Sequence, residues 1–91
     1  MTHEFGKVNV NQELDHTFIT EKEIKNIKPD CGCTSFTNKQ FEFTLKYKVT
    51  RIPYHLRSNG QTTQNRIKGV TVTFIDDSTK RFLIRMEVHE K

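Results

Sequence analysis

The sequence predicts an all-β domain, an antiparallel sandwich or barrel of six or seven short strands. Two observations support this prediction. Apolar residues alternate with polar ones at period two in several segments, as they do in strands with one buried and one solvated face. Turn-forming residues separate these segments, and no segment keeps a 3.6-residue period over the length of a helix. With 91 residues, the chain is expected to form a single domain, 1–91, with a small core.

The first third of the chain holds the weaker strand signals. "FGKVNV" (5–10) alternates valines with polar residues, and "NQ" follows it as a turn. In "LDHTFIT" (14–20), three residues share one face: Leu14, His16 and Phe18. "EKE" is a short polar turn, and "IKNIKP" (24–29) then leads into the two cysteines. These segments predict two or three strands.

The clearest strand is "FEFTLKYKV" (41–49), in which every second residue is apolar. "VTVTF" (70–74) and "RFLIRMEV" (81–88) repeat the pattern, and the turn "IDDSTK" between them predicts a hairpin. We expect the apolar faces of these strands to be mostly buried, with Phe43, Leu45, Tyr47, Val70, Val72, Phe74, Phe82, Ile84 and Met86 in the core.

The segment "RIPYHLRSNGQTTQNRIKG" (51–69) predicts the longest loop, because it contains a proline, an Asn-Gly pair and several polar amides. Loops of this length in compact domains are usually functional or mobile. We predict that partner-binding residues lie here, namely Tyr54, His55, Arg57 and Arg66. Aromatic and arginine side chains dominate interface energies, so an acidic partner surface is expected to face them. The alternative is a flexible, solvated loop.

The stretch "PDCGCTSF" (29–36) holds the two cysteines of the chain. On an extended strand Cys31 and Cys33 would share a face and could form half of a zinc or iron site, although none of the four histidines has a partner at ligand spacing. A strained disulfide and an activated nucleophile are further alternatives. The favoured interpretation is a structural motif of Pro29, Cys31, Gly32 and Cys33, with reduced thiols, no metal and no cofactor.

Charge and hydropathy exclude several classes of protein. The 15 Lys and Arg residues exceed the 11 Asp and Glu residues, and both signs occur along the chain, so a nucleic-acid-binding arm or an acidic tail is not indicated. No apolar run approaches the ~20 residues of a membrane helix, and no membrane association is expected. The first ten residues lack a signal-peptide core, which predicts either a chain that is cytoplasmic as made or a mature form whose leader was removed. Met1 favours the first, for which free thiols are expected.

"FGKV", "HTFIT", "IKNIKPDCGCTSF" and "FLIRMEV" occur in an order that resembles the immunoglobulin-like bacterial domain family of unknown function marked by Cys-Gly-Cys-Thr. The part from Lys28 to Thr34 is the most specific. The resemblance implies an immunoglobulin-like antiparallel β-sandwich of about seven strands, similar to major-sperm-protein-like and chaperone-like domains, without catalysis. Members are secreted by bacteria or encoded by tailed phages. The missing leader and the shortened "TEKE" loop depart from the pattern of secreted members, and "IPYHLRSNG" resembles a variant found in short phage-encoded members.

The expected function is therefore a non-enzymatic structural or adhesive module, a small phage virion component made in the host cytoplasm. As a capsid decoration, neck or tail protein, it would bind other virion proteins, or further copies of itself, through edge strands and the 51–69 loop. One alternative is a module of the bacterial cytoplasm or envelope that uses Cys31 and Cys33 for metal or redox contact. Another is a weak nucleic-acid binder with a basic cluster around Tyr54, formed by Arg51, His55, Arg57, Arg66 and Lys68.

Overall fold

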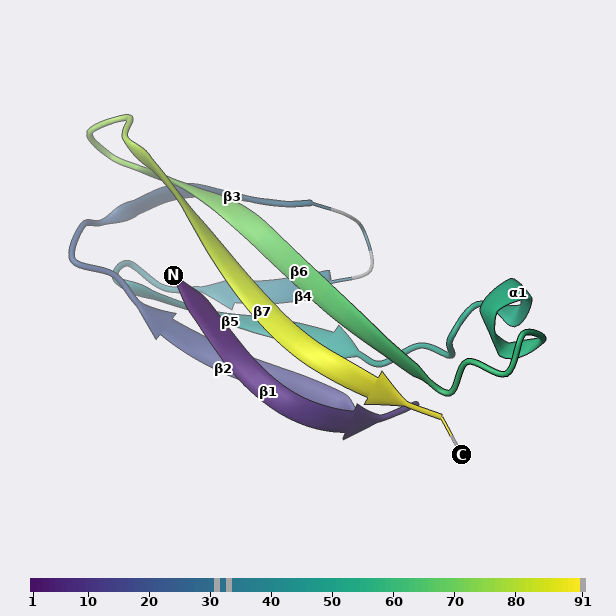
Figure 1. Ribbon diagram of the computed structural model, residues 1–91. Helices are drawn as coiled ribbons and strands as arrows, with labels where there is room; N and C mark the ends of the chain where they lie inside the picture. Colours follow the sequence, from purple (N-terminus) through teal and green to yellow (C-terminus); the bar gives the residue numbers. More distant parts are fainter. Residues whose placement is uncertain (31, 33, 91) are drawn as a thin grey trace.

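The computed structural model describes residues 1–30, 32 and 34–90, which form two packed β-sheets (Figure 1). The elements in chain order are β1 (Thr2–Asn9), β2 (Glu13–Ile19), β3 (Ile24–Pro29), β4 (Thr34–Asn38), β5 (Glu42–Lys48), α1 (Tyr54–Arg57), β6 (Thr63–Phe74) and β7 (Thr79–His89). The predicted all-β sandwich of about seven strands is confirmed.

The strand order places β1-β7-β6-β3 in one sheet and β2-β5-β4 in the other. The sets β3-β6-β7 and β2-β5-β4 correspond to the two sheets of an immunoglobulin-like sandwich. One pair departs from the purely antiparallel arrangement expected from the sequence, because β1 and β7 run parallel. The turn after β1 carries the chain to the opposite sheet, so β1 does not form a hairpin with β2 and lies instead along the edge of β7 (Figure 1).

Strand β1 contains a bulge. Glu4 lies opposite Arg85 and Lys7 opposite Glu87, so β1 has one more residue than β7 between these pairs. Gly6 has a φ of 73°, a conformation that residues with a Cβ rarely adopt. A bulge bends an edge strand and thereby makes it a poorer template for unwanted pairing.

Apolar side chains from both sheets fill the space between them, and all nine of the residues that we expected in the core are buried. The centre is aromatic: the rings of Phe18, Phe43 and Phe82 lie 5.0 to 5.3 Å apart. The core therefore follows directly from the period-two pattern of the sequence, because each strand turns its apolar parity inward.

A stack of rings closes the side of the sandwich between β1 and β2. The imidazoles of His3 and His16 are nearly parallel, with centroids 3.7 Å apart, and Phe5 and Phe18 contact their outer sides edge-on. Partial burial lowers the pKa of His16, the nearby His3 lowers it further, and Asp15 opposes both effects. A neutral His16 imidazole thus suits this position.

The predicted loop 51–69 is wrong in its second half. Residues from Thr63 onward belong to β6, where they pair with β7 from His89 inward. The strand was missed because Arg66 and Lys68 occupy inward-facing positions that are apolar in the other strands, so the alternation is hidden. The connection between β5 and β6 is correspondingly shorter, 49–62, and it contains α1.

Candidate functional site

Residues 49–62 form an arm that projects from one end of the sandwich (Figure 1). At its tip, Pro53 supplies a φ of −52° and a carbonyl that accepts hydrogen bonds from the N–H groups of Leu56 and Arg57. The single turn of helix closes when Ser58 N–H donates to the Tyr54 carbonyl at 2.8 Å. Gly60, with a φ of 85°, then reverses the chain toward β6.

The base of the arm is part of the hydrophobic core. Val49 and Ile52 are fully buried, with exposed fractions of 0% and 1%, and Leu56 packs partly against the same cluster. Burying an isoleucine side chain contributes about 2 kcal/mol relative to leaving it in water. The arm is therefore anchored in the body of the domain, unlike the flexible loop considered as the alternative above.

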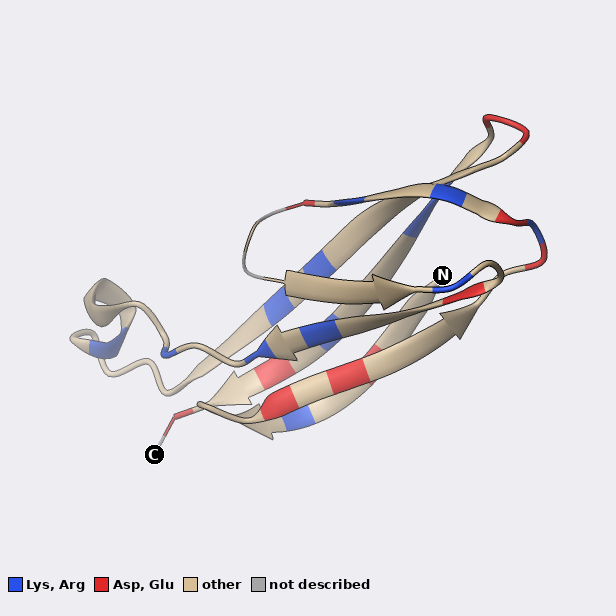
Figure 2. Ribbon diagram, turned by 180° about the vertical axis from the view of Figure 1, so that it is seen from behind, with Lys and Arg blue, Asp and Glu red and all other residues tan. Residues whose placement is uncertain are grey.

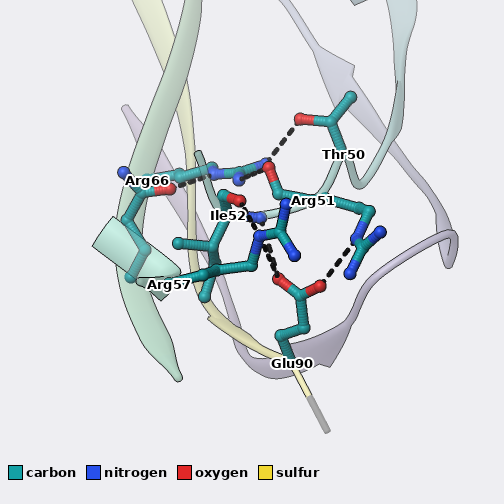
Figure 3. Close-up of polar contacts among 7 residues, drawn as sticks. Thr50, Arg51, Ile52, Arg57, Arg66 and Glu90 are labelled. Carbon is teal, nitrogen blue, oxygen red and sulfur yellow. Dashed lines mark hydrogen bonds and ion pairs between the residues drawn. The ribbon is translucent and has the colours of Figure 1, made fainter. Parts of the chain in front are cut away.

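Glu90, just after β7, is the polar anchor of the arm (Figure 3). Its side chain is 12% exposed and accepts hydrogen bonds from Arg51 Nε at 2.7 Å and from the Ile52 N–H at 3.2 Å. Arg57 Nε lies 3.8 Å from the same carboxylate. The hydrogen bond from Arg51 is the main reason that the pKa of Glu90 lies below its ordinary value. The carboxylate thus holds three successive parts of the arm.

Arg66 of β6 makes a second set of contacts with the arm. Its Nη1 donates to the Tyr47 hydroxyl at 2.9 Å. The same Nη1 donates to Thr50 Oγ1 at 2.9 Å, and Nη2 donates to the Arg51 carbonyl at 3.0 Å (Figure 3). Its Nε donates to Gln64 Oε1 at 2.8 Å. All four acceptors are neutral, so Arg66 positions the arm through hydrogen bonds and its charge is not neutralised by them.

The four predicted partner-binding residues consequently divide into two pairs. Arg57, which also donates to the Ile52 carbonyl at 2.9 Å, and Arg66 hold the arm in place. Tyr54 and His55 lie at the tip and face solvent, with 73% of Tyr54 exposed. The Arg57 guanidinium lies 5.5 Å from the Tyr54 ring centre and so orients the aromatic side chain. The structure brings all four into one region, and the tip pair is accessible to a partner.

Along the sequence, the charge around the arm is one-sided, whereas in the sheet Glu13 and Asp15 of β2 lie opposite Lys48 and Lys46. The sequence has no Asp or Glu from residue 43 to residue 75, whereas basic residues occur throughout this range: Lys46, Lys48, Arg51, Arg57, Arg66 and Lys68. Figure 2 shows blue bands on β5 and β6 toward the arm, and red at the turn between β6 and β7. The expectation that both signs occur along the whole chain does not hold for this range. A count of Asp and Glu along the sequence is enough to reveal the gap.

Two anchors of the arm were not identified from the sequence. Glu90 gave no signal, because an isolated acid 38 residues from Ile52 in sequence has no local pattern that links the two. Ile52 could have been recognised, since it is an isolated apolar residue directly before Pro53 in a polar stretch. Such a residue often closes the end of a core.

The cysteine motif is described in part. Cys31 and Cys33 lie outside the described residues, so their predicted reduced state and lack of metal stay predictions. Pro29 is the last residue of β3 and pairs with Val70, and the following Asp30 N–H donates to the Gly69 carbonyl at 3.0 Å. Gly32 borders an open depression of about 370 Å³ beside Lys46 and Lys48.

No group of three or more His, Cys, Asp or Glu side chains in residues 1–30, 32 and 34–90 is placed to hold a metal ion. Within the same residues, no helix has the length and apolar character needed to cross a membrane.

Comparisons of this chain with protein-family models, with curated proteins and with solved structures found no match. The arm and its surroundings therefore have to be interpreted from their own chemistry.

Proposed function

We propose that this chain is a non-enzymatic binding module that attaches to a partner protein through the tip of the arm. The observation that carries the proposal is the contrast between a firmly anchored base, with Ile52 1% exposed, and a tip at which Tyr54 is 73% exposed. An exposed aromatic ring on a pre-ordered support loses little conformational entropy when it binds, which is why tyrosine is common in interface hot spots.

The biological setting that we propose is a phage virion, in which the chain is a capsid decoration, neck or tail protein. Support for this setting comes from the resemblance around Lys28–Thr34 and from "IPYHLRSNG", which begins at Ile52 and includes α1. The arm supports the binding role independently of that resemblance. The elongated form of the domain, 48 × 18 × 17 Å, places the tip far from the opposite end and leaves it accessible for docking.

The substitution Tyr54→Ala tests the arm. We expect affinity for the native partner to fall by about 30-fold or more, as for a typical hot spot, while the midpoint of thermal unfolding stays close to that of the unaltered protein. Ile75→Ala is the matched control, because Ile75 is also largely exposed (59%) but lies in the turn at the opposite end. Unchanged affinity in Tyr54→Ala would mean that the tip is not the contact.

Native mass spectrometry of the particle from which the chain is isolated tests the setting. A fixed stoichiometry with a capsid, neck or tail protein is the expected result. Salt-dependent binding to DNA without such a protein would favour instead the nucleic-acid alternative, which the acid-free range 43–75 makes the second candidate.

A further inference from the structure

Strand β6 is longer than the strand that covers one of its two edges. It pairs with β7 from Thr63 to Thr73, whereas β3 covers the other edge from Val70 to Phe74. Among the described residues, no strand lies beside the stretch 63–67 on the β3 side, and we call this stretch the open edge. Figure 1 shows β6 continuing past the end of β3 toward the arm.

The hydrogen bonds at both ends of this stretch show which backbone groups face the open side. The Gly69 carbonyl accepts from Asp30 on the β3 side at 3.0 Å, and the Thr62 carbonyl accepts from Glu90 on the β7 side at 2.9 Å. Backbone groups alternate sides along a strand, so Asn65 and Ile67 direct their N–H and C=O groups away from β7. The carbonyl of Thr63 already accepts a hydrogen bond from Gln61 Nε2 at 2.8 Å.

Side chains on the two faces of the open edge differ in chemistry. On the inward face, Arg66 bonds to the Tyr47 hydroxyl, and Lys68 Nζ lies 5.6 Å from the Tyr47 ring centre. Neither side chain has a carboxylate within 4.0 Å among the residues that the structure describes. On the outward face, Ile67 is an exposed apolar residue, with 57% of its surface in solvent.

We propose that the open edge binds an extended segment of a partner protein as an added strand, with an acidic residue opposite Arg66 and an apolar residue opposite Ile67. Residues directly opposite on neighbouring strands share a face, so the acidic side chain lies beside Arg66 and diagonally near Lys68. Main-chain hydrogen bonds to Asn65 and Ile67 provide affinity, and the alternating side chains provide specificity. This inference rests on the proposed binding role and specifies the partner's segment.

A second copy of the chain fits the open edge less well. Symmetric pairing of two open edges would place the inward basic residues of both copies on the same face. In antiparallel pairing centred on Asn65, the two Arg66 side chains are diagonal neighbours on one face, within reach of each other, and their like charges disfavour the pairing. The edge therefore suits an acidic segment of a different protein.

The probe in the first experiment is a six-residue peptide of alternating valine and glutamate with both termini blocked. Its binding is measured by the exchange of the protein's amide hydrogens, detected by NMR. In the free protein, the amides of Asn65 and Ile67 should exchange fast and that of Arg66 slowly, because Arg66 N–H faces β7. Saturating peptide should slow exchange at Asn65 and Ile67 by about tenfold or more. The peptide with lysine in place of glutamate should bind at least about fivefold more weakly.

Two N-methylated peptides test whether the contact is a main-chain ladder. One is methylated on the valine nitrogens and the other on the glutamate nitrogens. Because only one parity of an added strand faces β6, one of the two should lose binding and the other should keep it. Loss in the valine-methylated peptide indicates antiparallel addition, and loss in the other indicates parallel addition.

Asn65→Pro removes an open-edge donor without removing a donor to β7, and Asn65→Ser is its matched control. We expect Asn65→Pro to abolish peptide protection and Asn65→Ser to retain it. The N-methylated peptides bind the unaltered protein, so they decide the question even if Asn65→Pro does not fold.

Several results would overturn the proposal. They are slow exchange at Asn65 and Ile67 in the free protein, absence of peptide protection at about 1 mM, or equal binding of both N-methylated peptides. Concentration-dependent dimers that Asn65→Pro abolishes would show that the occupant is a second copy. These outcomes are independent of the Tyr54→Ala measurement, so failure of the arm and failure of the open edge can be distinguished.

Discussion

Both ends of the molecule contain carboxylates that pair with basic side chains, and they differ in how many basic side chains share one carboxylate. In the β6–β7 turn itself, both acids have a basic partner: Lys22 lies 2.9 Å from Asp76, and Lys25 lies 2.8 Å from Asp77. At the arm end, the Glu90 carboxylate serves both Arg51 and Arg57, while Arg66 donates to neutral acceptors. The contacts of Arg66 at the arm end therefore leave its charge without a carboxylate partner.

The two ends also differ in what they bury. Ile75 in the β6–β7 turn is 59% exposed, and Ile52 at the base of the arm is 1% exposed. A tight turn needs little support, because local hydrogen bonds such as Ser78 N–H to Asp76 Oδ1 (3.0 Å) hold it. An arm of fourteen residues, 49–62, needs contacts with the core to keep its tip in one position. The arm therefore requires buried core contacts that the turn does not require, as expected of a segment that is kept for binding.

Replacing the two isoleucines gives the largest predicted difference between the ends. Ile52→Ala should lower the free energy of unfolding by about 2–4 kcal/mol, because it leaves a cavity at the edge of the core. Ile75→Ala should change it by less than about 0.5 kcal/mol. Urea denaturation measures both. Similar losses in the two variants would show that the arm is not anchored more firmly than the turn.

Removing the guanidinium of Arg66 should have a smaller effect. Arg66→Met loses four hydrogen bonds, including the one to the buried Tyr47 hydroxyl, and should cost about 1–2 kcal/mol. Arg85→Met is the control, because Arg85 is 54% exposed and pairs with Glu4 at 3.7 Å, an arrangement that contributes less than about 1 kcal/mol. Equal stability of the two variants in urea would mean that the Arg66 contacts are not formed.

As the pH falls, the contacts of the arm with Glu90 should be lost at a higher pH than those of the β6–β7 turn. Of the effects predicted here, this one should change the free energy of unfolding least. The Arg51 hydrogen bond lowers the pKa of Glu90 from its ordinary 4.5, so the unfolded chain takes up a proton first as the pH falls. The contribution of ionised Glu90 is complete above about pH 4.5 and is lost as the pH falls through the lowered value. The pKa of Asp76 lies much further below its ordinary value, because Ser78 and Lys22 donate to it.

NMR spectra recorded from pH 6 downward measure this difference. Amide signals of 51–57 should shift or broaden at a higher pH than those of 75–78. Glu90→Gln should show the loosened arm already at neutral pH, and Asp76→Asn should leave the arm unchanged. Simultaneous changes at both ends in the unaltered protein would contradict the assignment of Glu90 as the polar anchor.

Local pattern was enough to predict the strands but not the arm. Strands 41–49, 70–74 and 81–88 were found because their inward residues are apolar, and the buried Phe43, Val72 and Ile84 confirm them. The first half of β6 was missed because the charged residues Arg66 and Lys68 point inward there. Arg66 donates a hydrogen bond to the Tyr47 hydroxyl, and Lys68 lies over the Tyr47 ring. Contacts such as that of Glu90 with Ile52 join segments that are far apart in the sequence. No local sequence pattern accompanies such contacts, so they could not be predicted.

The binding role of the four candidate residues stays a prediction, and the structure adds which of them also make contacts within the protein. Tyr54 and Arg57 were both selected because aromatic and arginine residues are common at interfaces. The same guanidinium can bond a partner or the protein's own carbonyls, and the Ile52 carbonyl was not foreseeable as the acceptor. Composition therefore identified the segment, and geometry was needed to separate the residues that support the arm from those exposed at its tip.

The parallel pairing of β1 with β7 has a consequence for synthesis on the ribosome. The first strand to leave the exit tunnel finds its partner in the last, since Val8 pairs with Val88. Until β7 is translated, β1 has no strand to join. Contacts between such distant residues make folding slow. The nascent chain should thus complete its fold only after β7 has left the ribosome, and until then β1 is the segment that a chaperone would meet unpaired.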